Sequence, residues 1–135
     1  IAIQPNEVDH REQFASMLQR NGKYSQAIIH LLEAFEIEPM NCECAWDIGE
    51  CYDELNDKDK ANEYFLKAIE IDNEEDAFYC YEYAQWLIES MGMYESAKSY
   101  FLKAIQIEPN TDIIEAWRYR YAKILKRNGK HKDAI

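Results

Sequence analysis

Apolar residues recur along this chain with the spacing of amphipathic helices. Large, small and large apolar residues at positions i, i+1 and i+4 place a notch between two bulky side chains on one helix face. The pattern occurs at residues 14–18, 48–52, 83–87 and 121–125. A second helix can approach closely at each notch, and no segment shows the alternation expected of a β-strand.

A second apolar motif follows the notch in the first three copies. Residues 34–39 read Ala-Phe-Glu-Ile-Glu-Pro, residues 68–73 read Ala-Ile-Glu-Ile-Asp-Asn, and residues 104–109 read Ala-Ile-Gln-Ile-Glu-Pro, at spacings of 34 and 36 residues. An alanine stands seven residues before each copy, at Ala27, Ala61 and Ala97, and another follows at Ala134. The chain is therefore built from internal repeats.

A turn separates the two motifs of each unit. The turns are Asn21-Gly22, Asn56-Asp57, Met91-Gly92 and Asn128-Gly129. Glycine and asparagine tolerate the left-handed conformation that ends a helix, so each unit is predicted to be helix, turn, helix. The predicted helices are 8–20, 24–37, 42–55, 58–71, 76–90, 94–107 and 114–127, with an eighth beginning near residue 131.

The repeated residues resemble the tetratricopeptide repeat family over essentially the whole chain. The small and large residues typical of that family stand at Gly49, Tyr52, Ala61, Phe65 and Ala68 in the second unit and at Ala27, Ala34 and Pro39 in the first. The resemblance implies an all-α fold, a right-handed superhelix or α-solenoid of tandem helical hairpins, whose first helices line a concave groove. We expect the tail of a preceding repeat at 1–7, repeats at 8–41, 42–75 and 76–111, and a partial repeat at 112–135.

The sequence also departs from the family pattern. Where the family favours a tryptophan early in the first helix, the units carry Arg11, Ala45, Cys80 and Arg118. Extra residues fall before Ala77, in the turn around Met91 and at 112–114, and we expect them to alter the superhelical twist locally. Natural arrays end in polar capping repeats. Neither end of this sequence reads as a cap, so we expect a segment of a longer array.

The charge of the chain is strongly polarised. The formal net charge is −11, but residues 1–77 carry 19 acidic and 6 basic side chains while residues 78–135 carry 7 acidic and 9 basic ones. A chain with this balance is not expected to bind nucleic acid as a whole. The first two repeats are predicted to present an acidic surface and the last repeat a basic one.

The repeat register selects the side chains that should face the groove. They are Glu12, Ser16, Glu43, Trp46, Asp47, Glu50, Asp53, Phe78, Tyr81, Glu82, Gln85, Tyr119, Arg120 and Lys123. Trp46, Tyr81 and Tyr119 occupy equivalent positions, so they would form an exposed aromatic row unless they pack between adjacent repeats instead. Aromatic rings flanked by carboxylates suit a partner segment that carries Lys or Arg.

One well-known use of the resembled family is to clamp the acidic C-terminal tail of heat-shock chaperones with lysine, arginine and asparagine side chains. The matching positions here are Glu12, Ser16, Asp47, Phe78 and Glu82, or one unit later Trp46, Glu50, Glu82, Ala116 and Arg120. Acids stand where bases are needed, so we expect this chain not to bind that tail.

No catalytic or membrane motif stands out. The sequence has no Gly-rich phosphate loop, no G-x-S-x-G and no H-E-x-x-H, and no apolar run approaches the roughly 20 residues that span a bilayer. The four cysteines, Cys42, Cys44, Cys51 and Cys80, lie within helical patterns and lack the paired spacing that zinc usually takes. We expect reduced, mostly buried thiols, no cofactor or metal, and no enzymatic activity in this segment.

These observations predict an intracellular protein–protein interaction scaffold, cytoplasmic or nuclear, that binds a basic partner segment as a subunit of a larger complex. The alternative is a structural spacer or assembly subunit that packs on other repeat proteins. A contact between the basic last repeat and nucleic-acid phosphate is a third hypothesis.

Overall fold

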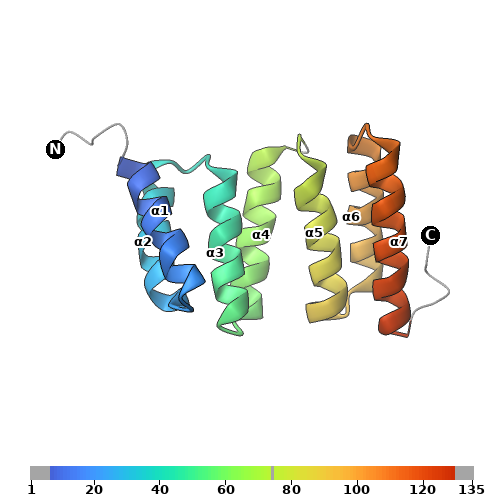
Figure 1. The fold of residues 1–135 in the computed structure, drawn as a ribbon, viewed down its shortest axis with the longest axis horizontal. Coiled ribbons are helices and arrows are strands. Elements are labelled where there is room, and N and C mark those ends of the chain that lie inside the picture. The colour runs from blue at the N-terminus through green and yellow to red at the C-terminus, as the bar shows by residue number, and fades with distance from the viewer. Residues whose placement is uncertain (1–6, 74, 130–135) are drawn as a thin grey trace. The chain divides into compact units, whose positions relative to one another are not determined.

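The computed structural model describes residues 7–73 and 75–129, and this part of the chain is helical and contains no strand (Figure 1). The helices are α1 (Glu7–Arg20), α2 (Tyr24–Ile37), α3 (Cys42–Glu54), α4 (Lys58–Asp72), α5 (Ala77–Trp86), α6 (Tyr94–Ile107) and α7 (Thr111–Arg127), with a π-helical segment η1 (Leu87–Met91) after α5. The all-α prediction is confirmed. The predicted eighth helix near residue 131 and most of the predicted tail at 1–7 lie outside the described residues.

The chain divides into two compact units between Asp72 and Asn73. Unit 1 contains α1 to α4, and unit 2 contains α5, η1, α6 and α7. Within unit 1, α1 pairs with α2 and α3 pairs with α4, and within unit 2, α5 pairs with α6 (Figure 1). Each pair is one helical hairpin of the kind that the repeats predict.

Small residues let the two helices of a hairpin approach each other closely. Ala15 of α1 and Ala27 of α2 have no exposed surface. In the next hairpin, a Cβ atom added to Gly49 of α3 would lie 2.6 Å from Cδ1 of Phe65 and 3.2 Å from the carbonyl oxygen of Ala61, both on α4. In both hairpins of unit 1 the notch of the first helix is therefore filled by the second helix of the same hairpin.

The turns end the first helices as predicted. Gly22, Asn56, Gly92 and Gly129 all have positive φ angles, of 74°, 66°, 63° and 78°. The left-handed conformation lets backbone amides beyond the turn bond back to the helix end. Such a bond joins the amide of Lys23 to the carbonyl of Leu18 at 2.8 Å.

The extra residue that the sequence places in the turn around Met91 lies instead at the end of the preceding helix. Ala84 and Ala97 are 13 residues apart, whereas the equivalent residues of the first two hairpins are 12 apart. The amide of Met93 bonds to the carbonyl of Leu87 across six residues, while the equivalent Lys23–Leu18 bond spans five. The helix absorbs the insertion as the wider π-helical turn η1, which buries both Leu87 and Ile88.

The last helix begins earlier than the sequence predicts. α7 starts at Thr111, so residues 112–114, which we expected to be an insertion before the helix, form its first turn. The side chain of Asn110 explains this start, because its Oδ1 atom accepts hydrogen bonds from the amides of Asp112 at 2.9 Å and Ile113 at 3.4 Å. An N-cap of this kind satisfies amides that the first turn leaves without helical partners.

Aromatic rings from α5, α6 and α7 stack in the core of unit 2. Tyr81 of α5 stacks on Trp117 of α7 with ring centroids 4.5 Å apart, and Phe101 of α6 stacks on Tyr121 of α7 at 4.1 Å. All four rings are buried. Because α7 contributes two of the four rings, it is part of this core even though the sequence predicts only half of its repeat.

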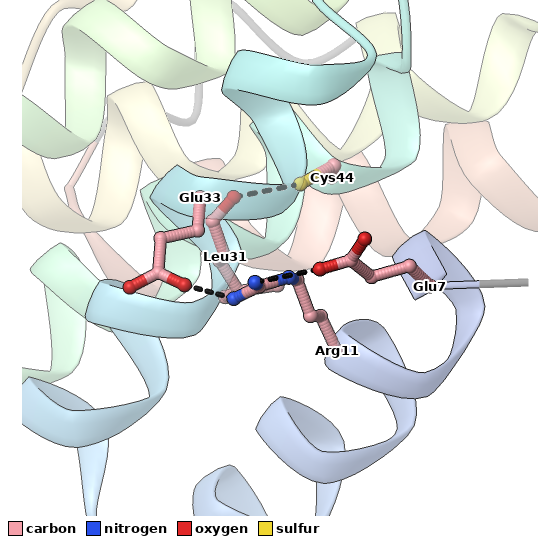
Figure 2. A network of polar contacts seen from close by, with 5 residues as sticks. All are labelled: Glu7, Arg11, Leu31, Glu33 and Cys44. Atoms are coloured by element: carbon pink, nitrogen blue, oxygen red, sulfur yellow. Dashed lines mark hydrogen bonds and ion pairs between the residues drawn. The ribbon is translucent and has the colours of Figure 1, made fainter. Parts of the chain in front are cut away.

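Unit 1 has an ion-pair network around Arg11, a position where the resembled family favours a tryptophan. Arg11 of α1 pairs with Glu7 at 2.8 Å and with Glu33 of α2, as Figure 2 shows. Nearby, the Sγ atom of Cys44 donates to the carbonyl oxygen of Leu31 at 3.2 Å. The guanidinium therefore ties the first two helices together at a position where an indole ring would do so by packing.

We predict that Gly49→Ala destabilises the protein, although the same change at an ordinary helical glycine is stabilising by up to about 1 kcal/mol. The new methyl group would overlap the ring of Phe65, and overpacking of this kind costs about 1–3 kcal/mol. The free energy of unfolding, measured by urea denaturation, should fall by that amount.

Gly22→Ala is the matched control, because Gly22 has a positive φ and a Cβ atom added there would meet no atom within 4 Å. The substitution Phe65→Leu should make the loss of unfolding free energy caused by Gly49→Ala smaller, because it reduces the overlap. It should leave the loss caused by Gly22→Ala unchanged. Strictly additive effects at Gly49 and Phe65 would contradict the proposed overlap.

Candidate functional site

An acidic surface of unit 1 is formed by Glu12 of α1 and by Glu43, Asp47 and Glu50 of α3. All four carboxylates were predicted to face the groove, and the structure brings them close enough to influence one another's protonation. Glu43 and Glu50 are exposed, whereas Glu12 and Asp47 are half-buried. We refer to these four residues as the acidic surface.

Asp47 is influenced by the negative charges of all three other members of the acidic surface. Burial, reinforced by the negative charges of Glu50, Glu43 and Glu12, raises the pKa of Asp47 from its usual 3.8 to about 7. Burial also raises the pKa of Glu12, although a hydrogen bond from Asn41 acts in the opposite direction. The surface therefore holds carboxylates that repel one another and would be stabilised by a cation.

Asn41 fixes the position of Glu12 relative to α3. Its Oδ1 atom accepts a hydrogen bond from the amide of Cys44 at 3.0 Å and so caps α3, while its Nδ2 atom donates to Glu12 at 2.7 Å. In the described part of the chain, no Lys or Arg lies within ion-pair distance of Glu12, Glu43 or Asp47. Asn41, at the start of α3, therefore positions Glu12 beside the carboxylates of α3, and no basic side chain among the described residues pairs with these three carboxylates.

Two other predicted site residues of unit 1 lie beside the acidic surface rather than within it. Asp53, near the end of α3, forms an ion pair with Lys58 at 2.5 Å, so its charge is compensated. Ser16 of α1 is half-buried, and it carries no charge that could add to the four carboxylates.

The prediction of an exposed aromatic row is wrong for two of its three members. Trp46 is only 8% exposed and packs on Phe65 at 4.4 Å, and Tyr81 is 1% exposed beneath Trp117. Both rings pack on aromatic partners within their own unit. Burying a large apolar ring stabilises the folded state more than leaving it in contact with water. Of the three, Tyr119 alone is exposed as predicted, at 66%.

Unit 2 contains a pocket between α5–η1 and α7, which we call the α5–α7 pocket. Its volume is about 230 Å³, and it is lined by Gln85, Glu89, Arg120, Lys123, Ile124 and Arg127. Of these, Gln85, Arg120 and Lys123 were predicted site residues. The repeat register did not select Ile124 and Arg127, which both lie on α7.

The remaining predicted residues of unit 2 lie along α5. The side chain of Phe78 is 48% exposed to solvent. Glu82 is half-buried, and burial raises its pKa while the nearby Arg120 lowers it. The negative charge on α5 is therefore partly compensated, because the positive charge of Arg120 on α7 lies near the carboxylate of Glu82.

The cysteines have structural positions. Cys44, Cys51 and Cys80 are buried and Cys42 is half-buried, which agrees with the prediction of mostly buried cysteines. Burial raises the pKa of both Cys44 and Cys51 to about 12, so neither is a reactive thiolate near neutral pH. Residues 7–73 and 75–129 contain no cluster of His, Cys, Asp or Glu side chains suited to a metal ion.

Among the described residues, no helix is both long enough and apolar enough to cross a membrane. The fold and its surfaces define a helical-repeat protein whose recurring unit is the antiparallel hairpin with a small-residue contact.

Comparison with known proteins identifies the repeat. Residues 43–75 and 79–111 each match the family described as tetratricopeptide repeat. These two segments of the chain are tetratricopeptide repeats. A segment of 72 residues, 53% of this chain, is 36% identical to anaphase-promoting complex subunit 3 of Dictyostelium discoideum, of which it spans only 7%.

Solved structures with low sequence identity share the fold. The Yersinia enterocolitica type III secretion chaperone SycD, in complex with a peptide of the translocator YopD, has a TM-score of 0.79 at 16% identity, over 98% of this chain and 99% of that one. The first repeat domain of Spaghetti (RPAP3), bound to the HSP90 peptide SRMEEVD, has a TM-score of 0.68 at 16% identity, over 90% of this chain and 98% of that one.

We predict that Asp47→Asn stabilises the protein in neutral and mildly alkaline solution. The folded state holds a proton on Asp47 up to about pH 7, while the unfolded state loses it near its usual pKa. Because the unfolded state then binds fewer protons, stability falls as pH rises from about 4 to 7. Removing the charge abolishes this loss.

The free energy of unfolding should therefore be higher for Asp47→Asn than for the wild type above about pH 7, with the two converging near pH 4. Urea denaturation at both ends of this range measures the difference. Glu54→Gln, an exposed position on the same helix, serves as the control. An equal gain for both variants would show that Asp47 has no special role.

Proposed function

We propose that this chain is a protein–protein interaction module that binds a partner segment carrying Lys or Arg on the acidic surface of unit 1. The observation that carries the proposal is the group of four carboxylates that are held close together without a compensating base on Glu12, Glu43 or Asp47. A buried acid with a raised pKa gains from a cationic partner, which favours its charged form.

The comparisons support binding in general terms. SycD and the Spaghetti domain were solved with peptides of other proteins, and both have the fold of this chain. The subunit of the anaphase-promoting complex that this chain matches is, by its name, part of an assembly. We therefore infer that this chain contributes to a multiprotein complex, with catalysis left to other components.

Because two of the three aromatic rings are buried, an aromatic row cannot be the binding site for the partner. Trp46 and Tyr81 hold the hydrophobic cores of their units, so they cannot anchor a ligand without unpacking. Specificity for the partner would therefore come mainly from the charges of the acidic surface. Electrostatic recognition of this kind gives fast association and strong salt dependence.

Charge reversal provides the first test. We expect the double variant Glu12→Lys, Glu50→Lys to bind a fluorescein-labelled peptide of alternating Lys and Gly at least about tenfold more weakly than the wild type. Each reversed charge loses an ion pair worth roughly 0.2–1 kcal/mol and also repels the peptide. Fluorescence anisotropy at low salt measures the affinity. Trp46 should not be altered in this test, since its loss would damage the core.

The matched control is Glu36→Lys, Glu70→Lys, which changes the net charge equally at exposed positions on α2 and α4. This control should retain most of the wild-type affinity. If both double variants lose affinity to the same extent, the peptide responds only to net charge, and the proposed surface is refuted.

The peptide SRMEEVD provides a second test. Although the Spaghetti domain was solved with this peptide, we expect no micromolar binding here, because Glu12 and Asp47 stand at positions where a clamp for an acidic tail needs a lysine and an asparagine, and Glu12 would repel the tail. Anisotropy with the labelled peptide measures it. A micromolar dissociation constant would contradict the assignment of a basic partner to unit 1.

A further inference from the structure

The α5–α7 pocket of unit 2 concentrates positive charge in a chain whose net charge is −11. Its lining contains the three bases Arg120, Lys123 and Arg127 and the single acid Glu89, an excess of two positive charges. Composition alone would give the opposite sign. The pocket therefore differs in chemistry from the acidic surface of unit 1 and suits a different ligand group.

Lys123 is the uncompensated base of this pocket. Its ammonium group lies over the ring of Tyr119, 5.1 Å from the centroid, and no carboxylate among the described residues lies within ion-pair distance of it. Arg127 pairs with Glu89 at 3.3 Å, but both side chains are largely exposed. An exposed pair of this kind contributes little, so Arg127 can exchange Glu89 for a stronger anion.

The buried hydroxyl group of Tyr81 organises the pocket wall. Gln85 donates to it at 2.7 Å, and burial raises the pKa of Tyr81 while the adjacent Arg120 guanidinium lowers it. Since the Tyr81 ring is fixed by its stack on Trp117, it restrains both polar side chains. A restrained donor loses less conformational entropy when a ligand binds.

The helix that forms one side of the pocket is also the irregular one. Glu89 lies in η1, the π-helical turn that accommodates the extra residue of this hairpin. The first helices of both hairpins in unit 1 end as ordinary α-helices. Single π-helical turns are frequent at functional sites, and here the turn shapes the wall that faces three bases.

We propose that the α5–α7 pocket binds one phosphorylated serine or threonine side chain of a partner protein. A phosphate monoester carries a charge of about −1.5 to −2 near neutral pH and offers three acceptor oxygens, which match the excess charge of the lining and the donors of Arg120, Lys123 and Arg127. The phosphate site is independent of the basic segment proposed for unit 1.

A nucleic-acid backbone fits the pocket less well than a single phosphate monoester. Glu82 and Glu89 both lie on the α5–η1 side, and a strand of consecutive phosphates leaving the pocket across that side would meet these carboxylates. One isolated phosphate group can contact the bases of α7 without doing so. The charge pattern therefore favours a modified side chain.

The test is a titration of the full 135-residue chain with O-phosphoserine, followed by the backbone amide signals in NMR spectra. We expect shifts at residues of the pocket, with Lys123→Ala weakening the binding about threefold or more. Glu89→Gln should strengthen it, because it removes the one negative charge of the lining. Lys126→Ala, an exposed base on the same helix outside the pocket, should leave it unchanged.

Several results would overturn the proposal. They are the absence of shifts at the pocket, an equal loss in Lys126→Ala and Lys123→Ala, equally strong binding of aspartate, and stronger binding of a short oligothymidylate. The last two would assign the pocket to a carboxylate or to nucleic acid. Each of these results leaves the lysine-peptide test on unit 1 unaffected, so failure here is distinguishable from failure of the proposed function.

Discussion

The close contact between small residues inside each hairpin is the constraint on which the rest of the structure depends. In α3 and α4 the backbones approach so closely that a methyl group on Gly49 would overlap Phe65 and crowd the carbonyl oxygen of Ala61. Alanines without exposed surface, such as Ala15 and Ala27, occupy the equivalent contact in the first hairpin. Two helices at this distance leave no room for large side chains between them, so the bulky residues must pack to either side of the contact.

That displacement explains where the aromatic rings go. Trp46 and Tyr81 each stand three residues before the small residue of their helix, and each turns toward a neighbouring ring. Trp46 packs on Phe65 of its own hairpin, and Tyr81 stacks on Trp117 of α7. With these two rings used for packing, the binding proposed for the acidic surface and for the α5–α7 pocket depends on electrostatics more than on apolar burial.

The sequence predicts those features that depend on local patterns. Helix positions and turns follow from the small-residue notch and from Gly22, Asn56 and Gly92, which adopt the left-handed conformation wherever a turn was expected. Such signals depend on residues that are close in sequence, and they recur in every unit. Where one copy is ambiguous, the other copies therefore still indicate the helix boundaries.

Features that depend on tertiary partners were harder to predict. The same register position holds buried Tyr81 and exposed Tyr119, because the ring of Trp117 covers the first and no described helix covers the second. The extra residue near Met91 was visible in the sequence, but only the hydrogen bond from Met93 to Leu87 shows that a helix absorbs it. Likewise, the cap formed by Asn110 draws residues 112–114 into α7, although their spacing indicated an insertion.

The position of Tyr81 links the hydrophobic core of unit 2 to its charged pocket. Its ring completes the aromatic stack, and its hydroxyl group lies beneath Gln85 and Arg120. Within unit 1, Asn41 has a similar double role, because it caps α3 and holds Glu12. In both units a residue needed for the fold also positions charged side chains. A change in packing would therefore move the charged groups at the surface even if no surface residue were substituted. The repeat architecture can therefore carry opposite charges in two units, since each charged surface is supported by its own core.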